Sequence, residues 1–491
     1  MKKFSLFSLI VLLVFVGTAL ASGAPPGSGW WSGEQIQNVS SNTAEIIVTA
    51  YDSADPSNTY TSSRMLDSGS STTFLPSDFA DMPSGFMGSA VVSAGEEIRA
   101  IVNLTNRLAG DFGVSGGLAA AQYQGMNAGD TTLNFPLAKN NYYSKTTTFY
   151  IQNAGGSAAA AEVTFRVGSN SYTYTTPSIS PGAMVAVSPA DASMPSGNTN
   201  GLGSMQVTSD VPLAGTVLEH FTTQNPATLL QATRGFTTLN ADSKVFAPII
   251  KNSYYNRFTG LQVQNANTSG DVSITVTYKA IDGCSGTYTD SASGVAPGTS
   301  HTFVHLPGST NLPSNCLAAA TVDVTGGDVV AIVNESFVPG YTGAQESTTY
   351  SALPEVDATT KVSVPLYKEY SYGKWTGLQV QNVGTSTAND VVLTFSGPTG
   401  TYVSNPLSIP AGAGLTFVDV RMKPASFWDG TAMTPTALGC DSGGCDGNGV
   451  FGITVTADQN VVAIANESPY PFAAVRVFQD KNNYEGFNLV P

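Results

Sequence analysis

The hexapeptide Gly260-Leu261-Gln262-Val263-Gln264-Asn265 is the clearest guide to the fold, because related copies occur at residues 33–38, 148–153 and 377–382. Measured between the terminal Asn residues, the copies are 115, 112 and 117 residues apart, and 109 residues follow the last one. Self-similarity of this kind indicates a tandem repeat protein. Units of about 110 residues are long enough for each to bury a core of its own.

Other landmarks recur in step with this hexapeptide. A lead-in of the type x-Pro-x-x-Lys precedes three copies, at residues 135–139, 247–251 and 364–368. A Pro/Gly turn follows in the same three units, at Pro181-Gly182, Pro297-Gly298 and Pro410-Ala411-Gly412. Each unit then ends in an apolar hairpin, at residues 98–103, 212–217, 329–334 and 461–466.

The apolar residues alternate with polar ones, and turn signals recur every 8–12 residues, so we expect an all-β chain. About seven short strands per unit indicate four tandem immunoglobulin-like β-sandwich domains in an elongated array. The predicted divisions are a signal peptide at residues 1–21 and repeats at 22–134, 135–246, 247–363 and 364–491.

These shared motifs resemble the tandem immunoglobulin-like repeats of bacterial cell-surface and secreted proteins, including those of filamentous Chloroflexi-type bacteria. The resemblance covers nearly the whole chain after residue 21. It implies surface display or adhesion, and it supplies no catalytic residues.

The first residues have the composition of a secretory signal. Lys2 and Lys3 precede an apolar run, and Ala19-Leu20-Ala21 offers a cleavage site of small residues. A retained membrane anchor is the alternative, but the apolar run is short for a membrane span and no second run follows. We therefore expect a secreted or cell-surface protein without a membrane span in its mature form.

The charge of the chain excludes some partners. The formal net charge is −15, and removing Lys2 and Lys3 takes it to −17. Nucleic-acid binding requires clustered Lys and Arg, which this chain lacks, and binding to anionic lipid is disfavoured for the same reason.

The four cysteines fit an exported protein with two disulfides. Cys284 and Cys316 fall at the same end of the third sandwich, which makes their pairing geometrically reasonable. Cys440 and Cys445 would form a local bridge in the fourth repeat. A zinc site is the competing interpretation, but no cysteine lies near a His at a ligand spacing.

Two recurring polar features allow a functional and a structural interpretation. The Gln and Asn side chains of the hexapeptide form either a recognition strip or caps for strand ends and turns, and we favour the caps. The carboxylates Glu219, Glu335 and Glu467 stand in register, and we expect them to make interdomain hydrogen bonds. One carboxylate per repeat cannot perform glycoside hydrolysis, which requires two facing groups.

The longest insertion, residues 421–450 in the fourth repeat, is the best candidate for a ligand-binding loop. Phe427, Trp428 and Asp429 are its candidate contacts, with Trp428 as the aromatic surface. Asp441, Asp446 and Asn448 carry oxygen atoms suited to Ca²⁺, but their spacing does not match the EF-hand loop. We therefore favour a disulfide-stapled solvated loop without a cofactor over a calcium site.

No catalytic motif appears in the sequence, so we expect a protein that is not an enzyme. The histidines are His220, His301 and His305. The last two share a strand face and would bind a metal only with further ligands, so simple exposure is the favoured interpretation. A secreted hydrolase is the least favoured function.

The two chain ends differ from the repeats between them. The first repeat lacks the lead-in and begins near Trp30-Trp31, whereas residues 484–491 resemble the start of a lead-in with no repeat after it. One hypothesis is head-to-tail self-assembly, in which this C-terminal segment adds a strand to the first repeat of another copy. The alternative is that both ends are ordinary caps.

The sequence thus predicts a non-catalytic structural or adhesive surface protein, with itself, glycans or matrix proteins as partners. An array of carbohydrate- or protein-binding modules that uses the loop of repeat 4 is the alternative.

Overall fold

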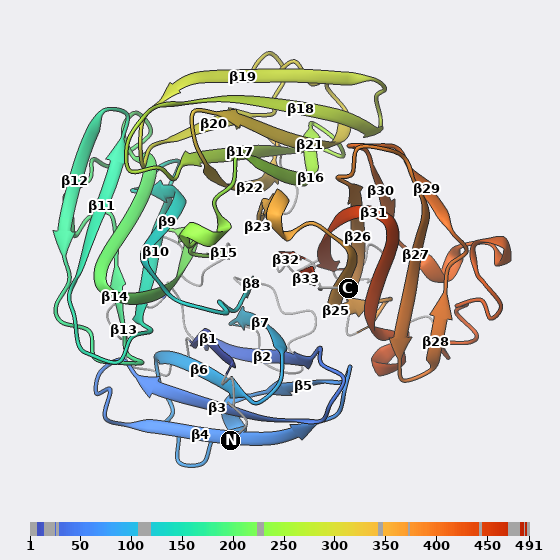
Figure 1. The fold of residues 1–491 in the computed structure, drawn as a ribbon, viewed down its shortest axis with the longest axis horizontal. Coiled ribbons are helices and arrows are strands. Elements are labelled where there is room, and N and C mark those ends of the chain that lie inside the picture. Colours follow the sequence, from blue (N-terminus) through green and yellow to red (C-terminus); the bar gives the residue numbers. More distant parts are fainter. Residues whose placement is uncertain are drawn as a thin grey trace. The chain divides into compact units, whose positions relative to one another are not determined.

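A computed structural model describes residues 7–13, 25, 29–106, 119–222, 230–341, 347–371, 374–440, 444–469, 482–485 and 487–488. These residues form antiparallel β-sheets and short 3-10 turns, without an α-helix, which confirms the all-β prediction (Figure 1). No helix in the described ranges is long and apolar enough to cross a membrane. The 3-10 turns are η1 (Pro76–Asp78), η2 (Thr238–Asn240), η3 (Glu355–Asp357), η4 (Val420–Met422), η5 (Ala425–Phe427) and η6 (Asp446–Gly449).

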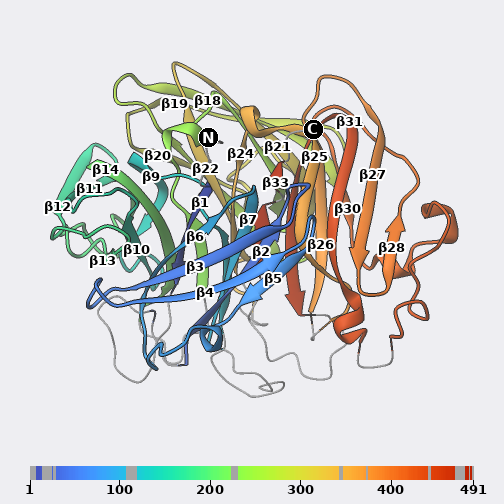
Figure 2. The same cartoon turned by 60° about the horizontal axis from the view of Figure 1, so that its bottom comes forward.

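The strands of repeat 1, together with β1 from residues 1–21, form two four-stranded sheets, in the orders β1-β6-β3-β4 and β5-β2-β7-β8 (Figure 2). Their bounds are β1 (Phe7–Leu13), β2 (Trp31–Asn38), β3 (Ala44–Asp52), β4 (Thr59–Leu66), β5 (Ser71–Phe74), β6 (Gly88–Ala94), β7 (Ile98–Thr105) and β8 (Ala120–Gln124).

In repeat 2 one long strand, β14, belongs to both halves of the repeat and joins seven strands into one sheet. The strands are β9 (Asp130–Lys139), β10 (Lys145–Asn153), β11 (Ala161–Val167), β12 (Asn170–Thr175), β13 (Met184–Val187), β14 (Leu202–Phe221) and β15 (Leu230–Arg234).

Repeat 3 again has two sheets, in the orders β19-β18-β21-β16-β24 and β20-β17-β22-β23. The strands are β16 (Lys244–Asn252), β17 (Arg257–Asn265), β18 (Val272–Asp282), β19 (Thr287–Val295), β20 (Ser300–Val304), β21 (Cys316–Thr325), β22 (Val329–Phe337), β23 (Thr348–Ser351) and β24 (Leu353–Pro354).

Repeat 4 resembles repeat 2, because the long strand β31 joins nine strands into one sheet. The strands are β25 (Thr359–Lys368), β26 (Lys374–Asn382), β27 (Ala388–Gly397), β28 (Gly400–Val403), β29 (Leu407–Ile409), β30 (Gly414–Phe417), β31 (Val450–Pro469), β32 (Asn482–Glu485) and β33 (Phe487–Asn488).

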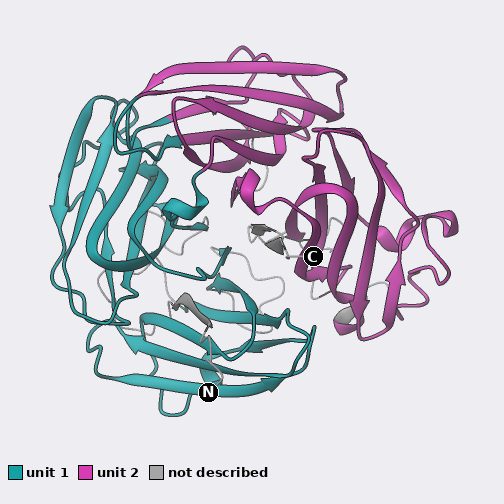
Figure 3. Cartoon of the chain, viewed as in Figure 1, with its two compact units in different colours: residues 1–241, 264–270, 296–300 teal, residues 242–263, 271–295, 301–491 magenta. Residues whose placement is uncertain are grey.

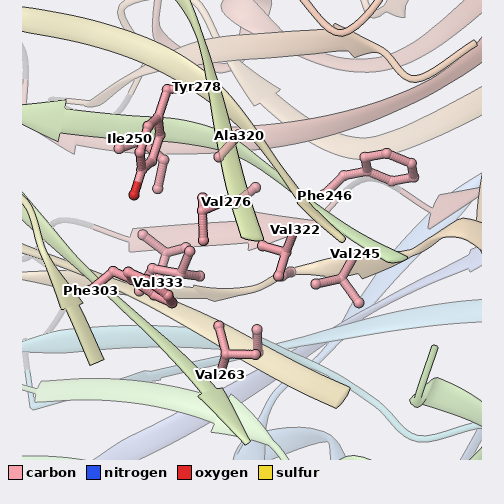
Figure 4. Packing of buried hydrophobic residues seen from close by; sticks show 14 of the residues in the cluster. Val245, Phe246, Ile250, Val263, Val276, Tyr278, Phe303, Ala320, Val322 and Val333 are labelled. Atoms are coloured by element: carbon pink, nitrogen blue, oxygen red, sulfur yellow. The ribbon is translucent and has the colours of Figure 1, made fainter. Parts of the chain in front are cut away.

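The alternating sequence pattern explains how these strands build a core. In β18, Val272, Ile274, Val276 and Tyr278 are buried while the residues between them face outward. Figure 4 shows Val276 with Val245, Val263 and Val322, which come from four different strands and gather in one cluster.

The chain divides into two compact units, each containing most of two repeats (Figure 3). Unit 1 comprises residues 1–241, 264–270 and 296–300, and unit 2 comprises residues 242–263, 271–295 and 301–491. The predicted boundaries of the four repeats remain a prediction.

The C-terminal segment does not behave as the lead-in that the sequence suggested. Strand β32 pairs with β31, and β33 pairs with β25 through Ser363↔Phe487. The same register closes repeat 3, where Phe246 faces Leu353. The described part of residues 484–491 is therefore the closing strand of its own repeat, and head-to-tail assembly stays a prediction; residues 486 and 489–491 lie outside the described residues.

Candidate functional site

The terminal Asn of each hexapeptide caps the turn that follows it. Asn153 Nδ2 donates to the carbonyl oxygens of Ser157 at 2.8 Å and Ile179 at 2.7 Å, and its Oδ1 accepts from the Gly155 N–H at 2.8 Å. Asn382 makes the same set of bonds in repeat 4. These bonds satisfy the backbone groups of a tight turn, in agreement with the structural interpretation of this residue.

The Gln before that Asn links neighbouring repeats. Gln152 Nε2 donates to Gly182 O at 2.9 Å and reaches Ala90 O of repeat 1 at 3.4 Å. Gln264 reaches Met205 O at 3.2 Å, and Gln381 reaches Ala320 O at 3.3 Å. All three Gln side chains are buried, so they hold junctions between repeats and do not form an exposed recognition strip.

The glycine of the Pro-Gly turn completes the junction. Gly182 has a φ of +78°, and a Cβ built on it would lie 2.5 Å from the Tyr51 ring of repeat 1. Its carbonyl accepts from Ser89 Oγ at 2.5 Å, as the Gly298 carbonyl accepts from Ser204 Oγ at 2.7 Å. Only glycine permits both this left-handed backbone and this close approach.

The carboxylates that recur in register are buried and paired with two cations. Glu467 lies 2.7 Å from Lys368 Nζ, at the end of the lead-in, and 3.5 Å from Lys374 Nζ, six residues later. Glu219 and Glu335 are paired in the same way, with Lys139 and Lys145 and with Lys251 and Arg257. These cations belong to the same repeat as the carboxylate, so the expected interdomain hydrogen bond is replaced by an ion pair within the repeat.

Electrostatics keep Glu219 and Glu467 ionised. Burial alone favours the protonated form, but the ammonium groups of Lys368 and Lys374 outweigh it and lower the pKa of Glu467 to about 2. The pKa of Glu219 is also lowered, by Lys139 and Lys145 against the effect of burial. Such groups carry no proton at neutral pH, and their ion pairs serve the fold.

The described residues of repeat 1 show no such ion cluster. The register of β2 on β7 places Ser32 opposite Leu104, where repeat 4 has Thr376 opposite Glu467. Two residues further along β2, Glu34 is paired with Val102. The corresponding pair in repeat 4 is Leu378 and Ala465, so Glu34 takes the position of an apolar residue. Glu34 is buried, neither carboxylate oxygen has a hydrogen-bond partner, and burial raises its pKa to about 8.

His301 and His305 do not form a site together. His305 is buried, against the expected exposure, and its ring nitrogens lie 2.9 Å from Thr259 O and 2.9 Å from Tyr278 Oη. Burial lowers the pKa of His305 to about 4, so the ring is neutral at physiological pH. His301 is half-buried and packs edge-on against Phe303.

Both predicted disulfides are present. Cys284 and Cys316 are joined with their Cα atoms 5.1 Å apart, and Cys440 and Cys445 with theirs 4.0 Å apart. The first bridge ties the β18–β19 turn to the start of β21. The second pins residues 440–445 within the long loop of repeat 4.

The long loop places its aromatic residues differently from the expected binding surface. Trp428 is only 3% exposed and packs against Phe395, Tyr402 and Phe427. Its ring therefore belongs to the core of repeat 4 and presents no face to a ligand. Phe427 is half-buried and Asp429 is exposed.

The loop residues proposed for calcium do not form a described site. Asn448 is exposed, Asp441 lies outside the described residues, and only the backbone of Asp446, in η6, is described. Within the ranges that the structure describes, no three His, Cys, Asp or Glu side chains come together as metal ligands.

The base of this loop carries a cluster that the sequence did not reveal. Glu369 is buried, its Oε2 accepts from Tyr367 Oη at 2.9 Å and from the Val420 N–H at 3.2 Å, and Arg421 Nε lies 3.7 Å from its Oε1. Arg421 also stacks over the Tyr370 ring at 3.7 Å. Burial raises the pKa of Glu369 to about 8. The only sequence signal was that Glu369 replaces Asn140 and Asn252, which anchor the equivalent loops through their amides.

Comparison with known proteins adds little. No family model and no curated protein matches the chain. Among solved structures, the chain is similar to the Thermotoga maritima 1070 protein, with 23% identity over 23% of this chain and 97% of that one, and a TM-score of 0.20. A TM-score this low supports neither a fold nor a function.

Proposed function

We propose that this protein is a non-catalytic extracellular scaffold of four immunoglobulin-like β-sandwich repeats, which acts as a structural or adhesive component of a cell surface or matrix. The observation that carries the proposal is the recurrence of the same structural bonds from repeat to repeat. The repeated Glu side chains are neutralised inside their own repeats, and the repeated Gln side chains join one repeat to the next.

The cysteines support an extracellular location. Both pairs are oxidised, as is typical of exported proteins, and the N-terminal sequence has the features of a secretory signal. The low content of charged residues, 11%, leaves a surface of Ser, Thr, Asn, Gln and Gly, which suits a spacer or matrix component.

The test combines localisation and electron microscopy. We expect antibodies against the purified protein to label the outside of intact cells or the surrounding matrix. We expect the purified mature protein to appear as particles of uniform shape, whose assembly does not depend on calcium. Labelling confined to the cytoplasm would overturn the proposed location. Hydrolysis of a polymeric substrate that a single substitution abolishes would overturn the non-catalytic role.

A second candidate function is ligand binding by the loop of repeat 4. It is favoured by the apolar side chains that this loop and its approach expose, Met422 at 65% and Val418 at 39%, beside the half-buried Phe427. The decisive variant is Phe427→Ala, because Trp428→Ala would disturb the core. Loss of binding to a glycan or cell extract in Phe427→Ala, with unchanged unfolding, would support this function.

A further inference from the structure

Strand β1 lies beside β6, in the place that the lead-in strands β9, β16 and β25 take beside β14, β21 and β31 (Figure 1). It is an edge strand, whereas β16 and β25 are each flanked by a closing strand as well, β24 and β33. It pairs with β6 from Phe7↔Ala94 to Leu13↔Gly88. The lead-in strands pair in the same direction with β14, β21 and β31.

The register is also the same. Leu9 faces Val92, as Val245 faces Val322 in repeat 3. Val11 is paired with Ala90, and the Ala90 carbonyl accepts a hydrogen bond from Gln152. In repeat 3, Ala247 is paired with Ala320, and the Ala320 carbonyl accepts a hydrogen bond from Gln381. Strand β1 therefore completes repeat 1 as a substitute lead-in.

The substitute belongs to the segment that we expect export to remove. Strands β9, β16 and β25 are continuous with their repeats, whereas β1 lies within residues 1–21. Cleavage after Ala21 would leave the β6 edge without a partner, and the segment 22–29 is rich in Gly, Pro and Ser and unsuited to replace a strand. An unpaired edge of this kind is a template for another strand.

A buried hydroxyl on β2, in the other sheet of repeat 1, lacks the partner that its counterparts on β10, β17 and β26 have. Thr147, Thr259 and Thr376 each accept a hydrogen bond through Oγ1 from the backbone N–H of the lead-in Lys, at 3.0, 3.1 and 2.9 Å. Ser32 takes this position in repeat 1, is 1% exposed, and its Oγ has no hydrogen-bond partner. Repeat 1 thus keeps the acceptor for a lead-in backbone that β1 does not supply.

A buried carboxylate lies two residues further along the same strand face. Both oxygens of Glu34 are without a hydrogen-bond partner, although buried charges are normally paired. In the other repeats the Lys that ends the lead-in pairs with a buried Glu. Ser32 offers an acceptor to the backbone N–H of an incoming Lys. Glu34 offers a carboxylate to its ammonium group from β2 itself, two residues from Ser32, whereas the paired Glu of repeat 4 lies on the neighbouring strand, opposite Thr376.

We propose that removal of the leader opens the β6 edge of repeat 1 to a strand from a different protein, with apolar residues at alternate positions followed by Lys. Its backbone pairs with β6, its last N–H donates to Ser32 Oγ, and its ammonium group pairs with Glu34. The lead-in strands of this chain are already paired within their own repeats, which favours a foreign donor over a second copy. The proposal rests on the export proposed above.

The experiment begins with the intact mass of the exported protein, which we expect to start at Ser22. The probe is a synthetic peptide of residues 243–252, a lead-in of this chain with the required pattern, and its control is the same residues in scrambled order. We expect the peptide to bind the mature chain and raise its lowest unfolding temperature. The scrambled peptide should bind at least about tenfold more weakly.

Two matched variants make the test specific. A chain with Ala19→Leu and Ala21→Leu resists cleavage, keeps β1, and should not bind the peptide. A peptide with norleucine in place of Lys251 should bind the mature chain more weakly than the original peptide. The two peptides should bind the Glu34→Gln chain with equal affinity, because the group that pairs with the Lys is then absent.

An exported protein that retains residues 7–13, equal binding by the cleavable and uncleavable chains, or pairing of mature chains with one another at this edge would each overturn the proposal. Failure of the peptide to bind the mature chain would do so as well, and it would leave the extracellular scaffold function intact. Absence of the protein from the cell exterior would overturn both proposals.

Discussion

Repeats 1 and 4 place opposite chemistry at the same backbone positions. In repeat 4, Glu467 is buried between two lysines, and Leu378 lies in the core two residues from Thr376. In repeat 1, Leu104 stands where Glu467 would be, and Glu34 stands where Leu378 would be. The carboxylate and the apolar side chain have thus exchanged places.

Partners, and not burial alone, decide whether a buried carboxylate is protonated or ionised. Both side chains are fully buried, yet the pKa of Glu467 falls to about 2 beside Lys368 and Lys374, while burial without a cation raises the pKa of Glu34 to about 8. Glu467 is a charged member of an ion cluster with two lysines, whereas Glu34 is a neutral acid whose oxygens have no hydrogen-bond partner.

The largest expected effect is that of Glu467→Ala. The substitution leaves Lys368 and Lys374 buried without a counter-charge, which costs about 3–5 kcal/mol of the free energy of unfolding. Urea unfolding, with hydrogen exchange of the β26 amides to locate the change in repeat 4, measures the loss. The control is Glu355→Ala, which removes an exposed carboxylate paired with Lys244 and should cost less than about 1 kcal/mol. Equal losses in the two variants would contradict the role of burial.

Acid should remove the same interaction gradually. The folded pKa of Glu467, about 2, lies below its ordinary value of 4.5, so its stabilisation is complete above pH 4.5 and is lost as the pH falls from 4.5 to 2. Hydrogen exchange of β26 at pH 5, 4 and 3 measures this loss. A variant with Lys368→Leu, Lys374→Leu and Glu467→Leu lacks the titrating group. If hydrogen exchange of β26 in this variant still speeds up between pH 5 and 3 as it does in the unsubstituted chain, other residues cause the loss of stability in acid.

Glu34→Leu should act in the opposite direction, in the chain that keeps residues 1–21. The folded pKa of Glu34, about 8, lies above 4.5, so stability is complete below pH 4.5 and is lost as the pH rises through 8. At pH 7 the substitution should therefore stabilise repeat 1 by roughly 3 kcal/mol, and the gain should shrink towards pH 4.5. Hydrogen exchange of β2 across this range measures it.

Glu34→Gln is the control for that experiment, because it removes the titration without adding an apolar side chain. In both variants the contribution of residue 34 to stability should no longer change with pH, so the difference from the unsubstituted chain should grow from pH 4.5 to 8 in each. A gain that stays constant with pH in Glu34→Leu would show that packing, and not ionisation, accounts for the effect.

The sequence was sufficient to predict the strands and both disulfides. Strict alternation in segments such as β18 and the recurring hexapeptide are local patterns, and the two cysteine pairs follow from where turns bring the chain back. The spacing of the cations in the ion clusters could be read from the sequence, because a Lys or Arg recurs six residues after each lead-in Lys. Their pairing with Glu219, Glu335 and Glu467 could not, because it depends on strand register across a sheet.

Other features required the fold itself. The burial of Trp428 depends on how a long irregular loop returns to the strands beside Phe395 and Tyr402. The C-terminal segment was misread because closing strands and lead-ins are both apolar. Its similarity to Arg234-Gly235-Phe236, seen in Glu485-Gly486-Phe487, would have identified it as a closing strand.

The smallest expected effect concerns the junctions that repeats 2, 3 and 4 share. Gln264→Ala removes the hydrogen bonds to Met205 O and Gly298 O, and one such bond contributes about 1 kcal/mol. The matched control is Gln262→Ala, which truncates a buried Gln of the same strand that makes no junction bond among those described. If Gln264 joins the repeats, hydrogen exchange should show repeats 2 and 3 unfolding at different free energies in Gln264→Ala but together in Gln262→Ala. Because Gln152 and Gln381 occupy the same position in their repeats, similar losses at those two sites would mark the junction as a property of the repeat, whereas a loss at Gln264 alone would confine it to one boundary.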